Sequence, residues 1–71
     1  MYDFSKLTGL IIEKCVTKSN FAKLMNLSET TIYKKLLGKI EFKPSEIEKA
    51  CNILEINESD IYVYFFRKKV Q

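Results

Sequence analysis

Lysine is the side chain whose number and spacing in this sequence best suit a chemical task. Seven lysines fall between residues 14 and 43 against two glutamates, so this segment carries a formal charge of +5. The segments before and after it each sum to −1, which leaves the whole chain at +3. A face that gathers ammonium groups suits contact with phosphate groups. Lysines also cluster on ordinary solvated helix faces. The secondary structure around these lysines must show whether they form a phosphate-binding surface or a solvated face.

Catalytic and metal-binding side chains are scarce. The sequence has no histidine, which removes histidine metal sites, Ser-His and Cys-His nucleophile pairs, and the side chain most often used as acid or base. Cys15 and Cys51 are the only cysteines, and each sits among apolar residues at helical spacing. We therefore expect buried, reduced thiols, with a single disulfide as the open alternative. We expect no enzyme activity, no metal and no cofactor.

Length and composition limit the architecture. A chain of 71 residues supports one domain, residues 1–71, with one small core. Two glycines and one proline are few for a small β-sandwich or barrel. No apolar run approaches the roughly 20 residues that cross a bilayer, and the N-terminus lacks the pattern of a secretory signal. These features predict a cytoplasmic protein that does not contact the membrane.

Helical periodicity organises the first third of the chain. Asp3 is a suitable N-cap for a first helix that ends near Val16. Thr17 is the expected N-cap of a short second helix over residues 18–25, and Asn26 suits the left-handed conformation that ends it. The residues expected to face inward share the three-to-four spacing of an apolar stripe: Phe4, Leu7, Ile11, Cys15, Phe21, Ala22 and Met25.

A third helix follows at once. Ser28 is its expected N-cap, Ile32 and Leu36 form its inner side, and Gly38 ends it. With about 100° of rotation per residue, the side chains that point broadly away from Ile32 are those of Thr30, Tyr33, Lys34 and Leu37. Leucine is apolar, however, so we expect the Leu37 side chain to pack against the following loop or the fourth helix.

A fourth helix is expected after Phe42. Pro44 suits a first helical turn, and Ser45 with Glu48 forms an S-x-x-E capping pattern. The apolar stripe of this helix consists of Ile47, Ala50, Cys51 and Leu54.

The end of the chain is less uniform. Asn57 is expected to cap a fifth helix that runs to about Phe65, with Glu58 and Asp60 in its first turn, where negative charge suits the helix dipole. The tract 61–66 is rich in β-branched and aromatic residues and fits a strand as well as a helix. An extended tail over 67–71 completes a compact all-α chain of five helices.

Two short helices joined by a tight turn form a helix-turn-helix, here from Thr17 to Lys39. Physical constraints fit this geometry: a small residue where the helices cross, a left-handed turn, and apolar side chains in the angle between them. The residues in those places are Ala22, Asn26, Leu27 and Ile32.

The segment resembles the helix-turn-helix of the Cro/CI-type (XRE-like) family. The pattern of that family is matched at Thr17, Ala22, Leu27, Ser28, Ile32, Gly38 and Lys39, and departed from at Lys18, Asn26, Tyr33 and Leu37. The opening M-Y-D-F-S-K-L and the ending Y-F-F-R-K-K-V-Q look similar to small Cro-like regulators encoded by phages of Gram-positive bacteria. The resemblance implies a lambda-repressor-like DNA-binding domain and a role as a transcriptional repressor on operator DNA in the bacterial cytoplasm.

The resemblance also implies which residues contact DNA. The helix over residues 28–37 would enter the major groove, with base-edge contacts from Ser28, Glu29, Thr30, Tyr33 and Lys34. Contacts to phosphates would come from Lys18, Lys39 and Lys43. Lys23 and Lys35 are expected to face solvent.

A single recognition helix reads few base pairs, so a homodimer is expected. Ile61, Tyr64 and Phe65 are expected to close the core. The side chains left for a dimer interface are Tyr62, Val63, Phe66 and Val70.

A second class of function stays open. The same fold could be a protein-interaction module, such as an antirepressor or an antitoxin-like partner, without DNA readout. Tyr33 and Leu37 on the predicted reading face favour this alternative, whereas the lysine distribution favours DNA.

Overall fold

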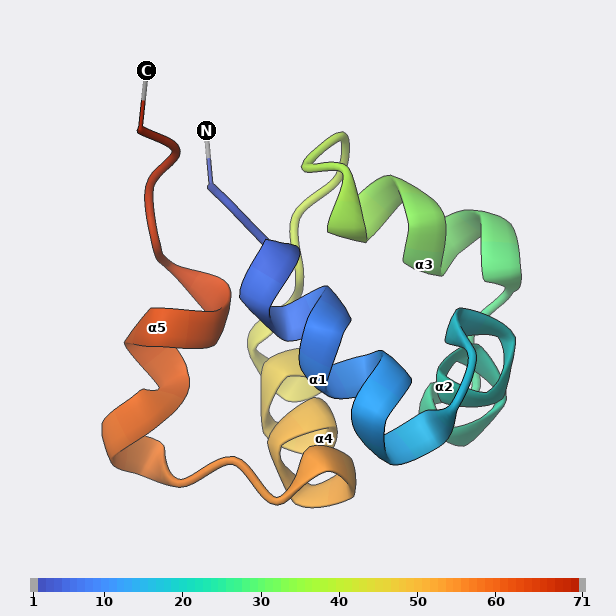
Figure 1. Cartoon of the computed structure of the whole chain (residues 1–71). Helices are drawn as coiled ribbons and strands as arrows, with labels where there is room; N and C mark the ends of the chain where they lie inside the picture. Colours follow the sequence, from blue (N-terminus) through green and yellow to red (C-terminus); the bar gives the residue numbers. More distant parts are fainter. Residues whose placement is uncertain (1, 71) are drawn as a thin grey trace.

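Five α-helices and one short 3-10 helix follow one another along residues 2–70, the part of the chain that the computed structural model describes. Figure 1 shows α1 crossing in front of α4, with α3 and α5 on opposite sides of this pair. The elements in chain order are α1 (Ser5–Cys15), α2 (Lys18–Met25), α3 (Glu29–Leu36), α4 (Pro44–Leu54), the 3-10 helix η1 (Glu58–Asp60) and α5 (Ile61–Phe65). The predicted all-α class with five helices is confirmed.

The ends of α2 and the start of α3 are fixed by short polar side chains. Thr17 Oγ1 accepts a hydrogen bond of 3.0 Å from the Asn20 amide, and Ser28 Oγ accepts one of 3.1 Å from the Thr31 amide. Each bond satisfies an amide that has no partner inside the helix. Asn26 ends α2 with φ 60° and ψ 39°. The three predicted caps are confirmed.

The start of α4 differs from the prediction. The N-cap is Lys43, Pro44 occupies the first helical position, and the Lys43 amide donates to Glu46 Oε1 at 2.9 Å. The capping pattern assigned to Ser45 and Glu48 is therefore wrong. Because proline lacks an amide hydrogen and favours the first position, the residue three places after the cap is Glu46, and that carboxylate reaches back.

The last helix is shorter than its prediction. Asn57 precedes η1 without a side-chain capping bond, and α5 itself has only the five residues Ile61–Phe65. The ambiguous tract 61–66 is thus helical up to Phe65, as predicted. Residues 67–70 then run extended, which confirms the described part of the predicted tail; its last residue, 71, lies outside the described residues.

The extended tail pairs with the beginning of the chain. Tyr2 and Lys68 form an isolated antiparallel bridge, and the Asp3 amide donates to the Arg67 carbonyl at 2.6 Å. Asp3 Oδ1 also accepts from the Ser5 amide at 2.9 Å, but the N-cap residue of α1 is Phe4, so the prediction of Asp3 as the N-cap is wrong by one residue. This hydrogen bond, with the nearby positive charges of the tail, lowers the pKa of Asp3. Figure 1 shows the segment before α1 and the segment after α5 close together.

The core lies where α1, α2, α4 and α5 meet. It contains the stripes predicted for the first two helices, together with Ile32 from α3 and Phe65 from α5. Ile61 and Tyr64 are half-buried against it, as expected for residues that close the core. The buried apolar residues are Phe4, Leu7, Ile11, Cys15, Phe21, Ala22, Met25, Ile32, Ala50, Leu54 and Phe65.

Both cysteines are free thiols, so the disulfide alternative is excluded in this structure. Burial raises the pKa of Cys15, which is buried, and of Cys51, which is half-buried. Over residues 2–70, none of the helices has the length and apolar character needed to cross a membrane. In the same range, no group of three or more His, Cys, Asp or Glu side chains is placed to hold a metal ion.

Candidate interaction surface

Helices α2 and α3 are held together by a tight turn and three apolar residues. The Leu27 amide donates to the Ala22 carbonyl at 3.0 Å, which continues the end of α2 into the turn. Ala22 and Ile32 are buried and Leu27 is half-buried. The residues predicted to support this helix pair thus lie where expected. Their packing leaves the opposite side of α3 free in this structure.

The five residues predicted for base contacts all lie exposed on α3 or at its cap: Ser28, Glu29, Thr30, Tyr33 and Lys34. Two of them are occupied within the chain. Besides capping α3, Ser28 Oγ donates to Thr31 Oγ1 at 2.8 Å. Glu29 accepts a hydrogen bond from the Ser19 hydroxyl, which ties the first turn of α3 to α2. The polar groups at the start of α3 therefore serve the helix pair itself.

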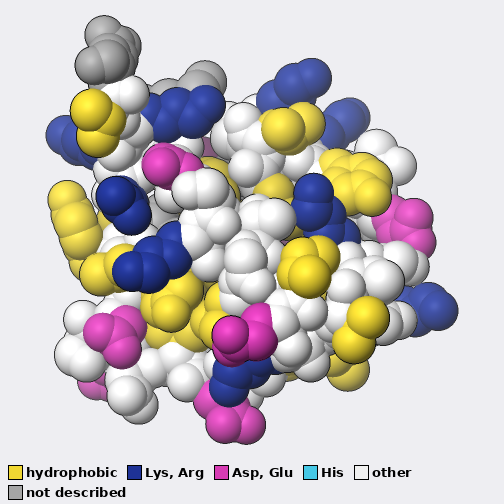
Figure 2. All heavy atoms as spheres, in the orientation of Figure 1, with side chains coloured by type: hydrophobic (Ala, Val, Ile, Leu, Met, Phe, Trp, Pro, Cys, Tyr) yellow, Lys and Arg dark blue, Asp and Glu magenta, His cyan; other side chains and the backbone are white. Residues whose placement is uncertain are grey.

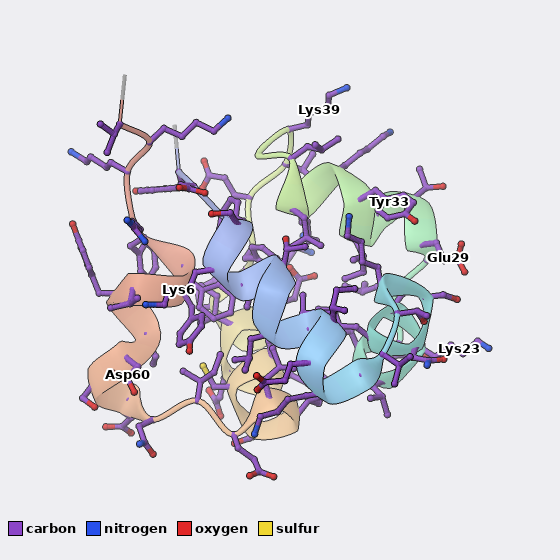
Figure 3. All side chains as sticks on the ribbon, in the orientation of Figure 1. Lys6, Lys23, Glu29, Tyr33, Lys39 and Asp60 are labelled. Carbon is purple, nitrogen blue, oxygen red and sulfur yellow. The ribbon has the colours of Figure 1, made fainter. Side chains whose placement is uncertain are left out.

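The middle of α3 presents an aromatic ring and a cation together. Lys18, at the first position of α2, places its Nζ 5.1 Å from the centroid of the Tyr33 ring. An ammonium group over a ring face is attracted by the ring quadrupole. Figure 3 shows Tyr33 projecting outward from α3 and Lys39 projecting from the loop that follows it.

The expectation that Leu37 packs against the loop or α4 is wrong, because its side chain is 64% exposed. Leu37 lies one turn after Tyr33, on the side of the helix that faces away from Ile32. Ile40, in the loop after α3, is exposed as well. The angular position on the helix, and not the apolar character of leucine, decided where Leu37 lies.

Of the predicted phosphate-binding lysines, Lys18 lies beside Tyr33, and Lys39 and Lys43 follow the end of α3. Lys39 is exposed in the loop after α3, and its amide donates to the Lys34 carbonyl at 2.9 Å. Lys43 is exposed at the start of α4, and Lys18 is half-buried beside Tyr33. No nucleic acid is part of the structure, so these DNA contacts stay predictions.

Lys35 does not face solvent, contrary to its prediction, and is only 4% exposed. Its Nζ donates to the Glu41 carbonyl at 2.9 Å, lies 2.7 Å from Glu46 Oε1, and is 5.7 Å from the centroid of the Phe42 ring. The sequence contains a signal for this position: Lys35 follows Ile32 by three residues, which places both on the same side of α3. Lys35 thereby fastens the loop after α3 to the start of α4.

Glu46 is the acidic partner in this arrangement. Burial opposes its ionisation, but the hydrogen bonds from Lys35 and from the Lys43 amide outweigh that effect and lower the pKa of Glu46. The carboxylate is therefore charged at neutral pH. Helix α3 therefore carries the exposed residues Tyr33 and Lys34 on one side and, on the other, Lys35, which pairs with Glu46.

A separate aromatic cluster lies beside this loop. The rings of Tyr2 and Phe66 meet edge to face with centroids 5.7 Å apart, and Phe42 meets Phe65 at 5.3 Å. A small cavity of about 70 Å³ opens among them. It is lined by Tyr2, Phe4, Gly38, Ile40, Glu41, Phe42, Ile47, Phe65 and Phe66.

The residues predicted for a dimer interface are spread over the end of the chain. Tyr62 and Val70 are exposed, Val63 is half-buried, and Phe66 is 36% exposed while its ring contacts Tyr2. No second chain is part of the structure, and the homodimer stays a prediction.

The helices and their packing define a five-helix, all-α protein with a closely packed α2–α3 pair. The family model described as "Protein of unknown function (DUF739)" matches residues 1–68, and the chain belongs to this family. No curated protein matches the sequence.

A solved structure is closely similar to this chain. It is the solution structure of the modulator of repression (MOR) of the temperate bacteriophage TP901-1 from Lactococcus lactis. The two chains are 51% identical with a TM-score of 0.82, and the match covers 99% of this chain and 95% of MOR.

These comparisons correct the assignment to the Cro/CI-type family. The matching family is DUF739, and the matching structure is a modulator of repression. The residues that carried the resemblance, such as Ala22, Leu27 and Ile32, are those that hold two helices together. Such residues specify a helix pair and not the family that uses it.

Proposed function

We propose that this chain is a phage regulatory protein that modulates repression by binding to a transcriptional repressor protein. The observation that carries the proposal is the 51% identity to the modulator of repression of TP901-1 over nearly the full length of both chains. At this identity and coverage the similarity extends well beyond the shared fold. The proposed role is binding in the host cytoplasm, without a catalytic step.

The first turn of α3 agrees with this proposal. In a DNA-reading helix this turn presents free donors and acceptors to base edges. Here Ser28 is occupied as the cap of α3, and Glu29 is bound to Ser19. The protein-interaction alternative is therefore better supported than readout of an operator by this chain alone.

The experiment uses the repressor encoded by the phage or prophage that carries this gene. Purified chain is titrated into purified repressor by calorimetry, and then into the repressor–operator complex in a gel-shift assay at about 150 mM salt. We expect a complex with the repressor in the absence of DNA, and a change in the apparent operator affinity of the repressor of about tenfold or more. Failure to bind the repressor at micromolar concentrations would contradict the proposal.

Direct DNA binding is the second candidate, and the +5 charge of residues 14–43 favours it. It predicts that the chain alone shifts operator DNA with a steep salt dependence. In that case Lys39→Ala would weaken binding to every sequence and flatten the salt slope by about one unit, whereas Lys34→Ala would relax base preference. Binding to the repressor without a shift of DNA would exclude this candidate.

A further inference from the structure

The exposed side of α3 carries more apolar surface than a solvated helix requires. Leu37 is 64% exposed, Tyr33 is 49% exposed, and Ile40 in the following loop is 41% exposed. Tyr33 and Leu37 are one helical turn apart and therefore neighbours on the same face. Single exposed apolar residues are ordinary, but several gathered at one end of a helix indicate a surface that gains from being covered.

Cations flank these apolar side chains. Lys34 and Lys39 are exposed on α3 and in its following loop, and Lys18 lies over the Tyr33 ring. Figure 2 shows hydrophobic and lysine side chains alternating over the upper right of the molecule, where Figure 1 places α3. The lysine-rich segment has two acidic residues, Glu29, which accepts a hydrogen bond from Ser19, and the exposed Glu41, and the three lysines outnumber them. The surface is therefore positive around an apolar centre, and its complement is negative around an apolar centre.

The apolar centre favours a protein over a nucleic acid as the occupant. Base edges are recognised by hydrogen-bond donors and acceptors, with thymine methyl groups as the apolar exception. Leu37 offers neither donor nor acceptor. A partner protein with apolar side chains inside a rim of Asp and Glu would cover the apolar centre of the α3 face and pair with its lysines at the same time.

The surface is also held in place from beneath. Lys35 fixes the following loop through the Glu41 carbonyl and Glu46, and the Gly38 amide donates to the Lys35 carbonyl at 3.1 Å. A surface ordered before contact loses less conformational entropy when a partner binds. The buried ion pair therefore supports the exposed face above it.

We propose that this α3 face, made of Tyr33, Leu37 and Ile40 with Lys18, Lys34 and Lys39, is the surface that docks onto the repressor. The inference rests on the proposed function and adds the location of the contact and the chemistry of the partner. The matching patch on the repressor presents apolar side chains flanked by carboxylates.

The apolar part is tested with a matched pair of leucines. Leu37→Ser removes the most exposed apolar side chain of the face. Leu24→Ser removes a leucine that is 54% exposed on α2 and is separated from Lys18 by about 120° around that helix. We expect Leu37→Ser to weaken repressor binding about tenfold and Leu24→Ser to change it by less than about twofold. Both sites are exposed, so circular dichroism should show that both variants fold.

The charged part is tested with a matched pair of lysines. Lys34→Glu places a negative charge on the α3 face, and Lys23→Glu places one on α2, away from Tyr33 and Lys39 (Figure 3). Binding of the wild-type chain should weaken as salt rises from about 50 to about 300 mM. Lys34→Glu should bind about tenfold more weakly at low salt and lose most of that salt dependence, whereas Lys23→Glu should behave nearly as the wild type.

The outcomes separate this inference from the proposed function. If the wild type binds the repressor but Leu37→Ser or Lys34→Glu binds as well as its control, the α3 face is not the docking surface and the proposed function stands. If the wild type does not bind the repressor, both are wrong. If the α3 variants lose affinity for operator DNA and not for the repressor, the face contacts nucleic acid and the inference is overturned.

Discussion

Lys35 Nζ lies 2.7 Å from Glu46 Oε1, and the two side chains are only 5% and 15% exposed. The pair joins the last turn of α3 to the first turn of α4. Because the same glutamate oxygen also accepts the Lys43 amide, one carboxylate fixes both the start of α4 and the loop before it. Removing either partner therefore affects the helix cap, the loop and the surface that the loop carries.

Lys35→Met should lower the free energy of unfolding by about 2–3 kcal/mol, because the variant leaves the Glu46 carboxylate and the Glu41 carbonyl without their cationic donor. Urea unfolding followed by circular dichroism measures this change. The control is Lys34→Met, which alters an exposed neighbour on the same helix and should change stability by less than about 0.5 kcal/mol. Equal losses in the two variants would mean that the buried ion pair has no special role.

Stability should fall in acid through Glu46. Its pKa is lower in the folded chain than the ordinary value of 4.5, so the unfolded chain binds the proton first as the pH falls. The stabilisation is therefore complete above about pH 4.5 and is lost as the pH falls through the folded pKa. In urea titrations at about pH 6 and about pH 3, Glu46→Gln should lose less unfolding free energy between the two pH values than the wild type does. Parallel pH profiles for the two proteins would contradict this assignment.

Val16 offers a route to a more stable chain. Its backbone has φ 72° and ψ −47°, and its side chain is 71% exposed. A β-branched residue is strained at positive φ, and the exposed side chain contributes little packing. Val16→Gly should raise the free energy of unfolding by about 1 kcal/mol, seen as a higher Tm. Ile12→Gly, at an exposed position inside α1, should lower it by about the same amount. A loss in both variants would show that Val16 is not strained.

The two cysteines should react slowly with a thiol reagent, and at different rates. Burial raises the pKa of both thiols, which lowers the fraction of reactive thiolate near pH 8. Cys15 is buried and Cys51 half-buried, so Cys51→Ser, which leaves Cys15, should react more slowly than Cys15→Ser. In urea the two variants should react at similar rates. A fast reaction of Cys15 in the native chain would contradict its burial.

Local signals in the sequence predicted the first three helices well. Thr17, Asn26 and Ser28 each act on amides or dihedral angles within a few residues, so a window of the sequence contains the whole interaction. The bounds of α2 follow directly from two of them. The start of α4 was misplaced because two capping patterns overlap there, and the position of Pro44 decides which carboxylate, Glu46 or Glu48, reaches the cap.

Interactions between distant residues were not predicted. Lys35 is buried because Glu46 and the Glu41 carbonyl meet it from another helix and a loop, and a polar residue type gives no sign of such partners. The family was also misassigned, since Ala22, Leu27 and Ile32 satisfy the geometry of a helix pair that proteins of different function share. The outward direction of Tyr33 was predicted correctly from helical rotation alone, whereas the packed position expected for Leu37 was wrong because its apolar character was given more weight than its angle on the helix.

The pairing of Asp3 with Arg67 has a consequence for the order of events during synthesis. The Asp3 amide donates to a carbonyl 64 positions further along the chain. The residues before α1 therefore cannot form their final hydrogen bonds until residue 67 has been synthesised. Closing so long a loop is an entropic penalty that only contacts made across the whole chain offset. The segment before α1 is therefore expected to become ordered late, after residue 67 has been synthesised and has left the ribosome.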